Sequence, residues 1–486
     1  MAIKKLAKKS VEEKLQTRPP VVVVLGHVDH GKTTLISKIY EKDLTRKEFG
    51  GISQHIGAYQ ITHQGKKITF IDTPGHVAFS KMRSRGAKVA DLAVLVVAAD
   101  EGVKPQTLES LKHIQEAKIP FLVAINKIDL PNVNLDWVKK NLAENRVLVE
   151  GYGGDIVAVP VSAKTGEGIE ELLEMILLLG EMAGLKANPK GKLEAVIIES
   201  KLDSQKGPLA TILVRNGSLK VGDEVVVENF GGKIKAMVSD KGENLKIAGP
   251  GQAVEVLGFS QVPVVGAKVE IGDGSQQTLF PSKMKVKTEV GPPKKQLKII
   301  LKADTQGTLE AILGSLSDEV KVVFSGVGNI NESDILLAKT TGAEVIGFNV
   351  KIAGTVQKLG ESEGVRLKTY KIIYELLEEL ERRVLKILEP TIDEEIFGQA
   401  EIVAEFMVKK QRVAGCRVKE GEISKQHPLH LKRGEKIIGD CQIISMKTGK
   451  QDIEKAKKGE EFGVTLSDKV DFRVGDMLIS FKKLPQ

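Results

Sequence analysis

The sequence contains few cysteines, few aromatic residues and no long apolar run. Its two cysteines, Cys416 and Cys441, cannot form a disulfide framework, so we expect a reducing, cytoplasmic compartment. No apolar run approaches the roughly 20 residues that a membrane-spanning helix needs, and no apolar segment follows the charged start Met1-Ala2-Ile3-Lys4-Lys5, so we expect no membrane partner. Because only 4% of the residues are aromatic, stacking of nucleic-acid bases on exposed rings is not expected to dominate recognition.

The charge balance is basic. Lys and Arg total 72 against 64 Asp and Glu, which gives a formal net charge of +8 and is consistent with a polyanionic partner. Residues 1–18 carry an excess of basic side chains and precede Pro19-Pro20, so we expect a flexible basic lead-in there. The length of 486 residues corresponds to three or four domains at about 150 residues each.

The alternation of apolar runs, turns and helical patterns divides the rest of the chain. Between Val21 and Val161, β-branched strands alternate with helical patterns, which predicts a parallel sheet covered on both faces. Turn-rich segments with short strands predict antiparallel barrels. We therefore predict a multidomain α/β plus β fold: an α/β domain at 19–188, a β-barrel at 189–290, a small α/β domain at 295–366, a connecting helix at 367–390 and a second β-barrel at 396–486.

The connecting helix is amphipathic. Its apolar stripe consists of Ile373, Leu377, Leu380, Val384 and Ile387, with charged residues between them. We expect this stripe to dock on its own domain. A coiled-coil partner helix is the alternative, although the pattern is short for a coiled coil.

A phosphate-binding loop is predicted near the start of the first domain. The run Gly26-His27-Val28-Asp29-His30-Gly31-Lys32-Thr33 follows an apolar strand and precedes a helical pattern that begins at Thr34. Glycines allow the backbone to approach phosphate oxygens at the start of a helix. We expect Lys32 to reach the β- and γ-phosphates and the Thr33 hydroxyl to bind Mg²⁺.

Two further motifs follow later strands in the same domain. Asp72-Thr73-Pro74-Gly75 would place the Asp72 carboxylate near Mg²⁺ and the Gly75 N–H near the γ-phosphate. Asn126-Lys127-Ile128-Asp129 would select guanine, because the Asp129 carboxylate matches the two N–H donors of that base.

The other residues around the base have supporting roles in this prediction. The stem of Lys127 would cover the base, and Asn126 would tie its turn to the phosphate loop. The run Ser162-Ala163-Lys164 would add backbone N–H donors to the guanine O6 atom. Together the three motifs predict a site for GTP or GDP with Mg²⁺.

These motifs resemble those of the translational GTPases. In that family the histidine after the Asp-Thr-Pro-Gly turn orients the attacking water, which implies this role for His76 beside Lys32 as the catalytic pair. The run Gly50-Gly51-Ile52-Ser53-Gln54-His55-Ile56-Gly57 occupies the first switch and is similar to bacterial translation initiation factor two. Ser53 stands where that family usually has threonine as a second Mg²⁺ ligand, and its hydroxyl would keep the role.

The resemblance to bacterial translation initiation factor two covers essentially residues 18–480, and the family's long N-terminal extension is almost absent. It includes the stretches Ala303-Asp304-Thr305-Gln306-Gly307-Thr308 and Tyr370-Lys371-Ile372-Ile373-Tyr374. It implies a GTPase domain at 19–188 and a factor that places formylmethionyl initiator tRNA on the small ribosomal subunit, promotes subunit joining and leaves after GTP hydrolysis. The implied partners are both ribosomal subunits with their rRNA, the initiator tRNA and other initiation factors, and we expect a monomer. The basic lead-in could contact ribosomal RNA or be a solvated tail.

The last barrel corresponds to the part of the family that holds initiator tRNA, and it departs from the family pattern. Thr448 replaces a usual arginine, and Phe462 replaces a usual cysteine. The candidate tRNA-binding residues implied by the resemblance are Cys416, Lys447, Lys450, Phe462 and Gly463.

Other interpretations remain at this point. An elongation-type GTPase or the GTPase subunit of a metabolic enzyme would share the nucleotide motifs, and a ribosome-binding scaffold with vestigial hydrolysis would share most of the chain. Cys416, His427, His430 and Cys441 could bind zinc, but they lack a Cys-x-x-Cys pair, and buried free thiols explain both cysteines more simply. We expect His63 and His113 to lie at the surface.

Overall fold

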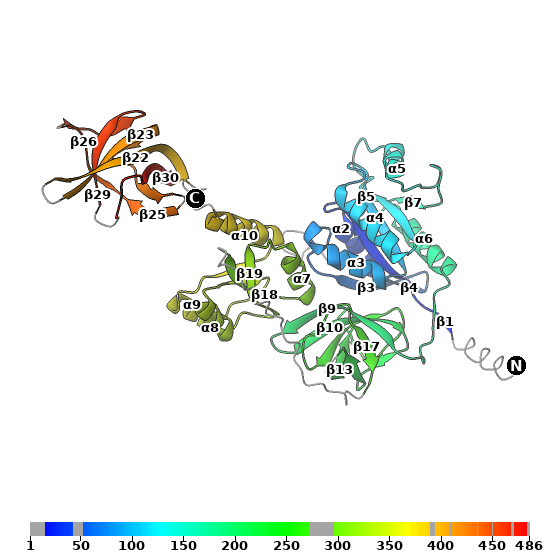
Figure 1. The fold of residues 1–486 in the computed structure, drawn as a ribbon. Coiled ribbons are helices and arrows are strands. Elements are labelled where there is room, and N and C mark those ends of the chain that lie inside the picture. Colours follow the sequence, from blue (N-terminus) through cyan, green and yellow to red (C-terminus); the bar gives the residue numbers. More distant parts are fainter. Residues whose placement is uncertain are drawn as a thin grey trace, which may run out of the picture. The chain divides into compact units, whose positions relative to one another are not determined.

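The structure is a computed structural model of the chain (Figure 1). It describes residues 15–41, 52–228, 230–272, 296–388, 394–408, 411–434, 436–449, 451–467 and 471–483. The predictions for most of the basic lead-in, for Gly50-Gly51 and for Lys450 lie outside the described residues. The chain divides into two compact units, Met1–Glu381 and Arg382–Gln486. None of the described helices is both long and apolar enough to cross a bilayer.

A six-stranded sheet forms the centre of the first domain. Its order is β3-β4-β2-β5-β6-β7, with β3 antiparallel to β4 and the other neighbours parallel. The strands are β2 (Val21–Gly26), β3 (Gly57–His63), β4 (Lys66–Asp72), β5 (Leu92–Ala98), β6 (Phe121–Asn126) and β7 (Ala158–Pro160). Every residue of β2 and β5 is buried, as expected for apolar central strands covered on both faces.

Helices cover both faces of this sheet (Figure 1). They are α2 (Lys32–Tyr40), α3 (Ser80–Val89), α4 (Pro105–Ala117), α5 (Leu135–Glu144) and α6 (Ile169–Met182), with a 3₁₀ turn η3 (Val77–Phe79) before α3. Leu35 of α2 and Leu172 of α6 belong to one buried core with Val22 of β2. The first domain therefore has the predicted α/β organisation, with the carboxyl ends of its parallel strands at one edge.

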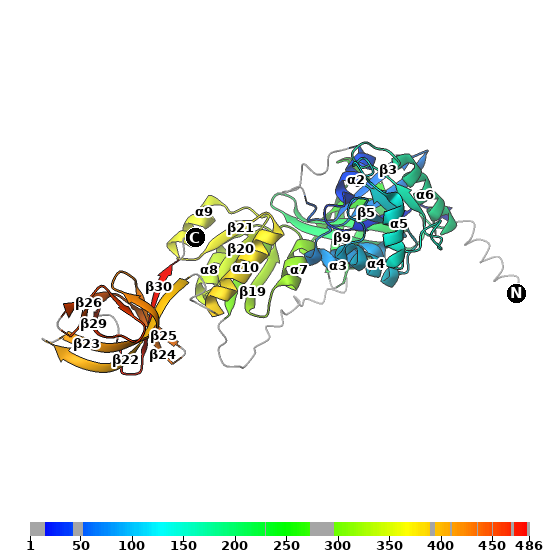
Figure 2. The ribbon, with the colours of Figure 1, turned by 90° about the horizontal axis from the view of Figure 1, so that it is seen from above.

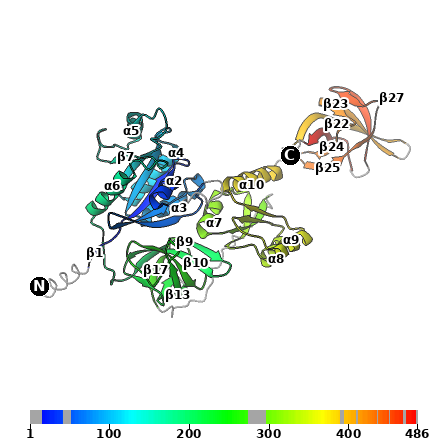
Figure 3. The same ribbon diagram turned by 180° about the vertical axis from the view of Figure 1, so that it is seen from behind.

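The end of the predicted lead-in is structured, which corrects the prediction for residues 15–18. Gln16–Thr17 form β1, which pairs antiparallel with β8 (Lys186–Ala187) after α6 (Figure 3). The Arg18 guanidinium donates to Asp91 Oδ1 at 2.6 Å, and the Asp91 side chain is only 3% exposed. The basic composition predicted a solvated tail. Composition alone does not reveal that a buried carboxylate, that of Asp91, lies within reach of Arg18.

A β-barrel follows the first domain in the sequence. Its strands are β9 (Glu194–Asp203), β10 (Gly207–Asn216), β11 (Leu219–Lys220), β12 (Glu224–Val227), β13 (Phe230–Val238), β14 (Asn244–Leu245), β15 (Ile247–Ala248), β16 (Ala253–Phe259) and β17 (Lys268–Ile271). The main sheet runs β12-β17-β9-β10-β16-β13-β14, and β12 also pairs with β13, which closes it around a core. Alternate apolar residues such as Ile212 and Val214 of β10 point into that core.

The third domain is a small parallel sheet with helices on both faces (Figure 2). The sheet order is β19-β18-β20-β21, and all pairs are parallel. The elements are β18 (Leu297–Ala303), α7 (Gln306–Ser315), β19 (Val320–Val327), α8 (Glu332–Thr341), β20 (Glu344–Phe348), α9 (Gly354–Ser362) and β21 (Leu367–Tyr370). Helices α8 and α9 pack on one face through Ile335 and Val356.

The helix predicted at 367–390 begins later than expected. Leu367–Tyr370 form β21, in register with Val345–Phe348 of β20, and α10 (Ile373–Leu388) starts after it. The strand was missed because four residues are too few to show a period of two. Leu376 rather than Leu377 is fully buried on α10, and Lys368 Nζ lies 3.6 Å from Glu379 Oε1, so the start of the helix docks on its own domain.

The second unit contains an antiparallel sheet that wraps around its own apolar core. Its strands are β22 (Glu394–Val408), β23 (Gln411–Ser424), β24 (Leu429–Arg433), β25 (Lys436–Cys441), β26 (Ile443–Thr448), β27 (Gln451–Asp452), β28 (Lys455–Lys457), β29 (Glu461–Leu466) and β30 (Met477–Lys483). The order is β25-β24-β30-β22-β23-β29-β26-β27, with β28 paired to β23.

Candidate nucleotide-binding site

The predicted phosphate loop lies between β2 and α2 and requires both of its glycines. Gly26 and Gly31 have φ of 147° and 84°, a region that side chains disfavour. A Cβ atom on Gly31 would lie 2.4 Å from Asn126 Nδ2. The loop leads directly into the first turn of α2, whose free backbone N–H groups and positive dipole end suit phosphate.

A cavity of about 190 Å³ opens beside this loop. Among the described residues its lining comprises nine predicted site residues and two others: Val28, Asp29, Gly31, Lys32, Thr33, Thr34, Ser53, Gly75 and His76, with Ile52 and Tyr374. The structure therefore brings four segments together around one space: the phosphate loop, the first switch, the turn Asp72–Gly75 with His76, which is the second switch, and the start of α10.

Lys32 is a buried residue in the lining of this cavity. Its ammonium group donates to the carbonyl of His27 in the same loop, and burial lowers the pKa of Lys32. A Cβ atom on Gly75 would lie 2.5 Å from Lys32 Nζ, so the backbone of the Asp-Thr-Pro-Gly turn passes directly beside the ammonium group. The Lys32 ammonium group and the backbone N–H of Gly75 therefore lie close enough together for negatively charged phosphate oxygens to bind to both.

The three predicted magnesium ligands lie together. The Thr33 and Ser53 hydroxyls are in direct contact, and Thr33 Oγ1 donates to Asp72 Oδ2 at 3.1 Å. Asp72 Oδ1 is buried and has no hydrogen-bond partner among the residues that the structure describes, and burial raises the pKa of Asp72. A buried oxygen that lacks a donor, next to two hydroxyl oxygens, fits a hard cation such as Mg²⁺.

The base-recognising motif is joined to the phosphate loop by Asn126. Its amide Nδ2 donates to the carbonyl of His30 at 2.8 Å, and its Oδ1 accepts from the backbone N–H of Ala163 at 2.9 Å. One buried side chain thus links three loops, and the tie to the phosphate loop was expected from the sequence.

Asp129 is held by a hydrogen bond in the same region. Ser162 Oγ donates to Asp129 Oδ1 at 2.6 Å, and this bond holds the pKa of Asp129 below its usual range. The carboxylate is therefore ionised near neutral pH and able to accept from two N–H donors. Lys127 lies 3.4 Å from Glu101 Oε1, and Lys164 is exposed beside the turn.

The two histidines of the phosphate loop, His27 and His30, are not part of the cavity lining. The His30 ring is fully buried, and its Nδ1 accepts from the backbone N–H of Ala98 at 3.2 Å. The ring of His27 meets the His30 ring edge-on, at 5.1 Å between centroids. The described contacts give the His30 side chain a packing role, so its expected ligand contact is limited to the backbone.

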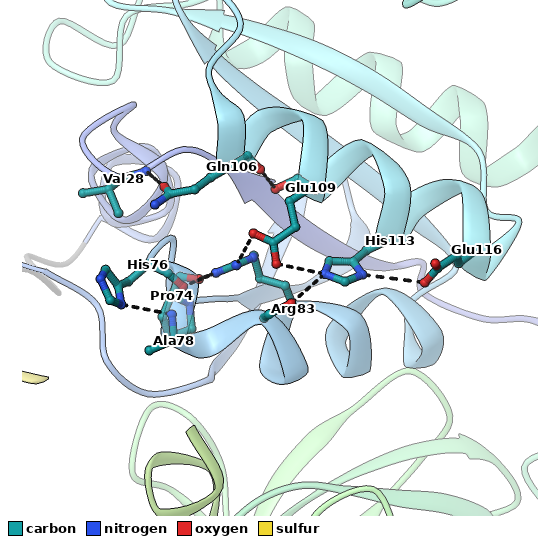
Figure 4. Close-up of polar contacts among 11 residues, drawn as sticks. Val28, Pro74, His76, Ala78, Arg83, Gln106, Glu109, His113 and Glu116 are labelled. Carbon is teal, nitrogen blue, oxygen red and sulfur yellow. Dashed lines mark hydrogen bonds and ion pairs between the residues drawn. The ribbon is translucent and has the colours of Figure 1, made fainter. Parts of the chain in front are cut away.

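His76 lines the cavity and lies directly before η3 (Figure 4). Its Nδ1 accepts from the backbone N–H of Ala78 at 3.1 Å. Burial, together with the charge of Arg83, lowers the pKa of His76. The ring is therefore neutral near pH 7, and because Nδ1 accepts, the proton is on Nε2.

Two residues that support the site were missed from the sequence. The guanidinium of Arg83 donates to the carbonyls of Pro74 and His76, and Gln106 Oε1 accepts from the backbone N–H of Val28 at 2.8 Å (Figure 4). Both lie on helices of ordinary polar composition. No pattern in the sequence indicates that Arg83, among several basic neighbours, is fully buried.

The expectation that His113 lies at the surface is wrong. Its side chain is 11% exposed and lies 3.3 Å from Ser80 Oγ and 3.4 Å from Glu109 Oε1 (Figure 4). The ring connects α4 to the start of α3. His113 is mostly buried because it lies on the face of α4 that packs against α3.

Two candidate tRNA-binding residues are buried, which corrects that expectation. Cys416 on β23 and Phe462 on β29 are directly opposite each other in the sheet and are 1% and 3% exposed. Both point into the core of the second unit, so we do not expect either side chain to contact an external ligand directly. Lys447 is exposed and lies 3.3 Å from Asp452, and Gly463 is half-buried on β29.

The zinc alternative has no support in the part of the chain that the structure describes. No group of three or more His, Cys, Asp or Glu side chains there is arranged to hold a metal. Cys416 and Cys441 are buried free thiols, and burial raises the pKa of Cys416 to about 12.

Three known families match successive stretches of the first unit. Residues 18–181 match the family described as Elongation factor Tu GTP binding domain, residues 192–271 match Elongation factor G domain 2, and residues 275–381 match Translation-initiation factor 2. The first match covers the nucleotide site described above.

Relatives match over nearly the whole chain. Translation initiation factor IF-2 of Clostridium novyi is 42% identical, over 97% of this chain and 73% of the relative. The IF-2 of Geobacillus thermodenitrificans is 44% identical, over 96% of this chain and 68% of the relative, and that of Dehalococcoides mccartyi is 44% identical, over 99% and 86%. These matches span both described units as well as the nucleotide site, and the chain therefore belongs to the translation initiation factor IF-2 family.

Proposed function

We propose that the cavity beside the phosphate loop binds GTP or GDP with Mg²⁺, and that the predicted site residues have the roles given below. Membership of the family makes the chain a GTP-hydrolysing translation initiation factor. The observation that carries the site assignment is the double hydrogen bond of Asn126, because it ties the guanine-recognising turn to the phosphate loop. One nucleotide can then satisfy both parts of the site.

Lys32 would neutralise the β- and γ-phosphate oxygens. In the structure its ammonium group donates to the His27 carbonyl within the loop, so a phosphate would replace or share that acceptor. Thr33, Ser53 and Asp72 would hold Mg²⁺, and the bound ion would neutralise charge on the β- and γ-phosphates. The Gly75 N–H would lie close to the γ-phosphate, since its backbone passes beside Lys32.

His76 would orient the water that attacks the γ-phosphorus. The bond from Ala78 N–H to Nδ1 leaves the proton on Nε2, so the ring can donate a hydrogen bond to water through that atom. It cannot accept a proton at Nε2 in this tautomer. His76 would therefore act by positioning the water, while Lys32 and the loop N–H groups stabilise the charge on the transferred phosphoryl group.

Further partners belong to the same proposal. We infer that the factor contacts both ribosomal subunits and their rRNA, works with other initiation factors, and binds formylmethionyl initiator tRNA through the second unit. The GTP-bound state would order both switch segments, and hydrolysis would release them so that the factor leaves the ribosome.

The test measures GTP turnover with and without ribosomal subunits, together with protection of formylmethionyl-tRNA from deacylation. His76→Ala should leave GTP affinity nearly unchanged and lower ribosome-stimulated turnover by roughly 10² to 10⁴. Equal turnover of the variant and the parent would reject His76. No turnover by the parent, even with ribosomes, would favour a binding scaffold with vestigial hydrolysis.

Magnesium binding is tested separately. Ser53→Ala removes one of the three oxygen ligands and should raise the Mg²⁺ concentration needed for half-maximal turnover, while Ser53→Thr keeps the hydroxyl and should behave like the parent. The Ser53→Thr control shows whether the Mg²⁺ dependence comes from the hydroxyl or from a changed shape of the first switch.

A further inference from the structure

The first turn of α10 reaches the nucleotide cavity from the third domain. Tyr374 lines the same cavity as the phosphate loop, although more than three hundred residues separate them in the sequence. Its ring centroid lies 4.0 Å from that of His76, with the two planes 78° apart. Burial, with a further contribution from Asp29, raises the pKa of the Tyr374 phenol, so it stays protonated above the loop.

A side chain of the first switch fixes the start of this helix. Gln54 is 3% exposed, and its Nε2 donates to the carbonyl of Lys371 at 2.9 Å, while its Oε1 accepts from the backbone N–H of Ile373 at 3.2 Å. The Ile373 N–H is one of the donors that a helix start leaves unpaired. Gln54 therefore caps α10 and fixes the backbone one residue before Tyr374.

The next residue in the switch, His55, makes a second link to the third domain. Its Nε2 lies 2.8 Å from Asp304 Oδ2, and Asn349 Nδ2 also donates to that oxygen. Ser53, on the other side of Gln54, touches the Thr33 hydroxyl in the proposed magnesium site. Three consecutive switch residues thus connect the nucleotide site to the domain that carries Tyr374.

Tyr374 and Ala78 hold the His76 ring from two sides. The edge-on packing of two aromatic rings is attractive, and the hydrogen bond from Ala78 fixes Nδ1. The Tyr374 contact favours this one orientation of the imidazole, so any rotation of the ring toward a water at the γ-phosphate gives up that contact. If the Tyr374 contact is stronger in the observed orientation of the His76 ring than in the orientation that positions the water, the contact slows hydrolysis.

We propose that Tyr374 is a positioning residue that holds His76 in a resting orientation and restrains GTP hydrolysis until the start of α10 moves away from the cavity. This proposal rests on the proposed role of His76 in orienting water. Gln54 is the contact through which the first switch keeps the restraint in place.

The test measures turnover of GTP by the full-length protein without ribosomes. Tyr374→Ala should raise kcat by about 2- to 10-fold, the size expected for one aromatic pair, and leave KM for GTP nearly unchanged. Tyr374→Phe keeps the ring and should have the kcat of the parent. Glu375→Ala changes the exposed neighbour on the same turn and serves as the matched control.

Gln54→Ala provides a second route that leaves both rings intact. It frees the start of α10, so it should raise kcat in the same direction as Tyr374→Ala, and the double variant should gain no more than the larger single effect. Lower or unchanged kcat in Tyr374→Ala, or an equal rise in Tyr374→Phe, would overturn the proposal. GDP affinity and thermal unfolding confirm that each variant is folded.

Failure of the restraint and failure of the role of His76 give different results. If His76→Ala has the turnover of the parent with ribosomes, the role of His76 is wrong and the restraint falls with it. If His76→Ala is impaired but Tyr374→Ala is not faster, only the restraint is wrong. In the double variant His76→Ala with Tyr374→Ala, the gain from removing Tyr374 should disappear.

Discussion

The guanidinium of Arg83 donates to the carboxylate of Glu109 at 2.7 Å and so joins α3 to α4 beneath the turn that carries His76. Its other terminal nitrogen donates to the carbonyl of Pro74 at 3.0 Å and also to that of His76. The Arg83 side chain is fully buried, and that of Glu109 is 25% exposed. A single cation therefore holds the backbone on both sides of Gly75.

Replacing Arg83 should destabilise the protein and disturb the turn. Arg83→Met leaves Glu109 without its partner and two carbonyls without a donor, so we expect a loss of about 3 kcal/mol in the free energy of unfolding. Chemical unfolding in urea measures this, with Lys88→Met, an exposed position on the same helix, as the control. A loss no larger than that of the control would contradict the structural role.

Arg83→Lys separates charge from geometry. Lysine keeps the positive charge but cannot reach three acceptors in one plane, so turnover should fall even where stability is largely kept. Turnover equal to that of the parent would mean that the charge alone is sufficient.

His30 should make stability depend on pH. Burial lowers its pKa in the folded protein from 6.5 to about 4. The unfolded chain therefore binds more protons between these values, so this contribution is fully present above pH 6.5 and is lost as the pH falls toward 4. The loss amounts to about 3 kcal/mol over that window.

Comparison with a non-titrating variant isolates this effect. His30→Gln keeps an acceptor for the Ala98 N–H. As the pH is lowered from 7 to 4.5, the unfolding free energy of the parent should fall relative to that of the variant. A difference that stays constant from pH 7 to pH 4.5 would show that another group dominates.

The phosphate and base motifs were predictable from the sequence because their geometry is local. Lys32 and Thr33 begin a helix that follows a buried strand after one short loop, and Asp72 and Asn126 end β4 and β6, two strands that run in the same direction in one sheet. The carboxyl ends of such strands meet at one edge, so residues far apart in the chain converge there by the topology alone.

The rest of the site depends on packing that has no sequence signature. Arg83 is one of several basic residues on α3, and only the fold shows that it alone is fully buried. Gln54 and Tyr374 lie in different domains, and no periodicity links them. In the second unit the chemistry of Phe462 suggested a ligand contact, whereas the alternation of side chains along β29 points the ring inward.

Asp129 should determine guanine specificity. Asp129→Asn replaces two acceptor oxygens by one acceptor and one donor, so GTP affinity should fall by about 10- to 100-fold, the value of a hydrogen bond to a charged group. Xanthine nucleotide has an extra carbonyl that accepts from the amide, so it should bind to this variant more tightly than to the parent. Titration calorimetry with both nucleotides measures this, and unchanged GTP affinity would reject the assignment.

Ser162→Ala is the matched control for Asp129. It removes the hydroxyl that donates to Asp129 at 2.6 Å but leaves the carboxylate in place. We expect a smaller loss of GTP affinity and no gain for xanthine nucleotide. A preference for xanthine nucleotide in this variant would show that specificity does not come from the carboxylate.

The second unit should bind initiator tRNA through its exposed strand surface rather than through Cys416 or Phe462. Thr448 is exposed on β26 beside Lys447, and its hydroxyl donates to the carbonyl of Glu461 at 3.4 Å. Thr448→Arg adds a guanidinium at a position where family members usually have one. It should tighten binding of formylmethionyl-tRNA by about 1 kcal/mol or more and make binding more sensitive to salt, because charge-assisted phosphate contacts exceed neutral ones.

Phe462 is expected to stabilise the second unit rather than to contact tRNA, since its ring is 3% exposed in the core. Phe462→Ala should cost about 3–5 kcal/mol of stability in this unit, whereas Phe462→Leu should keep both the fold and the preference for formylated over unformylated tRNA. If Phe462→Leu unfolds at the temperature of the parent but loses that preference, the ring contacts the ligand after all. If Thr448→Arg also leaves binding unchanged, the exposed face of β26 is not the tRNA surface, and the initiator tRNA must lie elsewhere on the second unit.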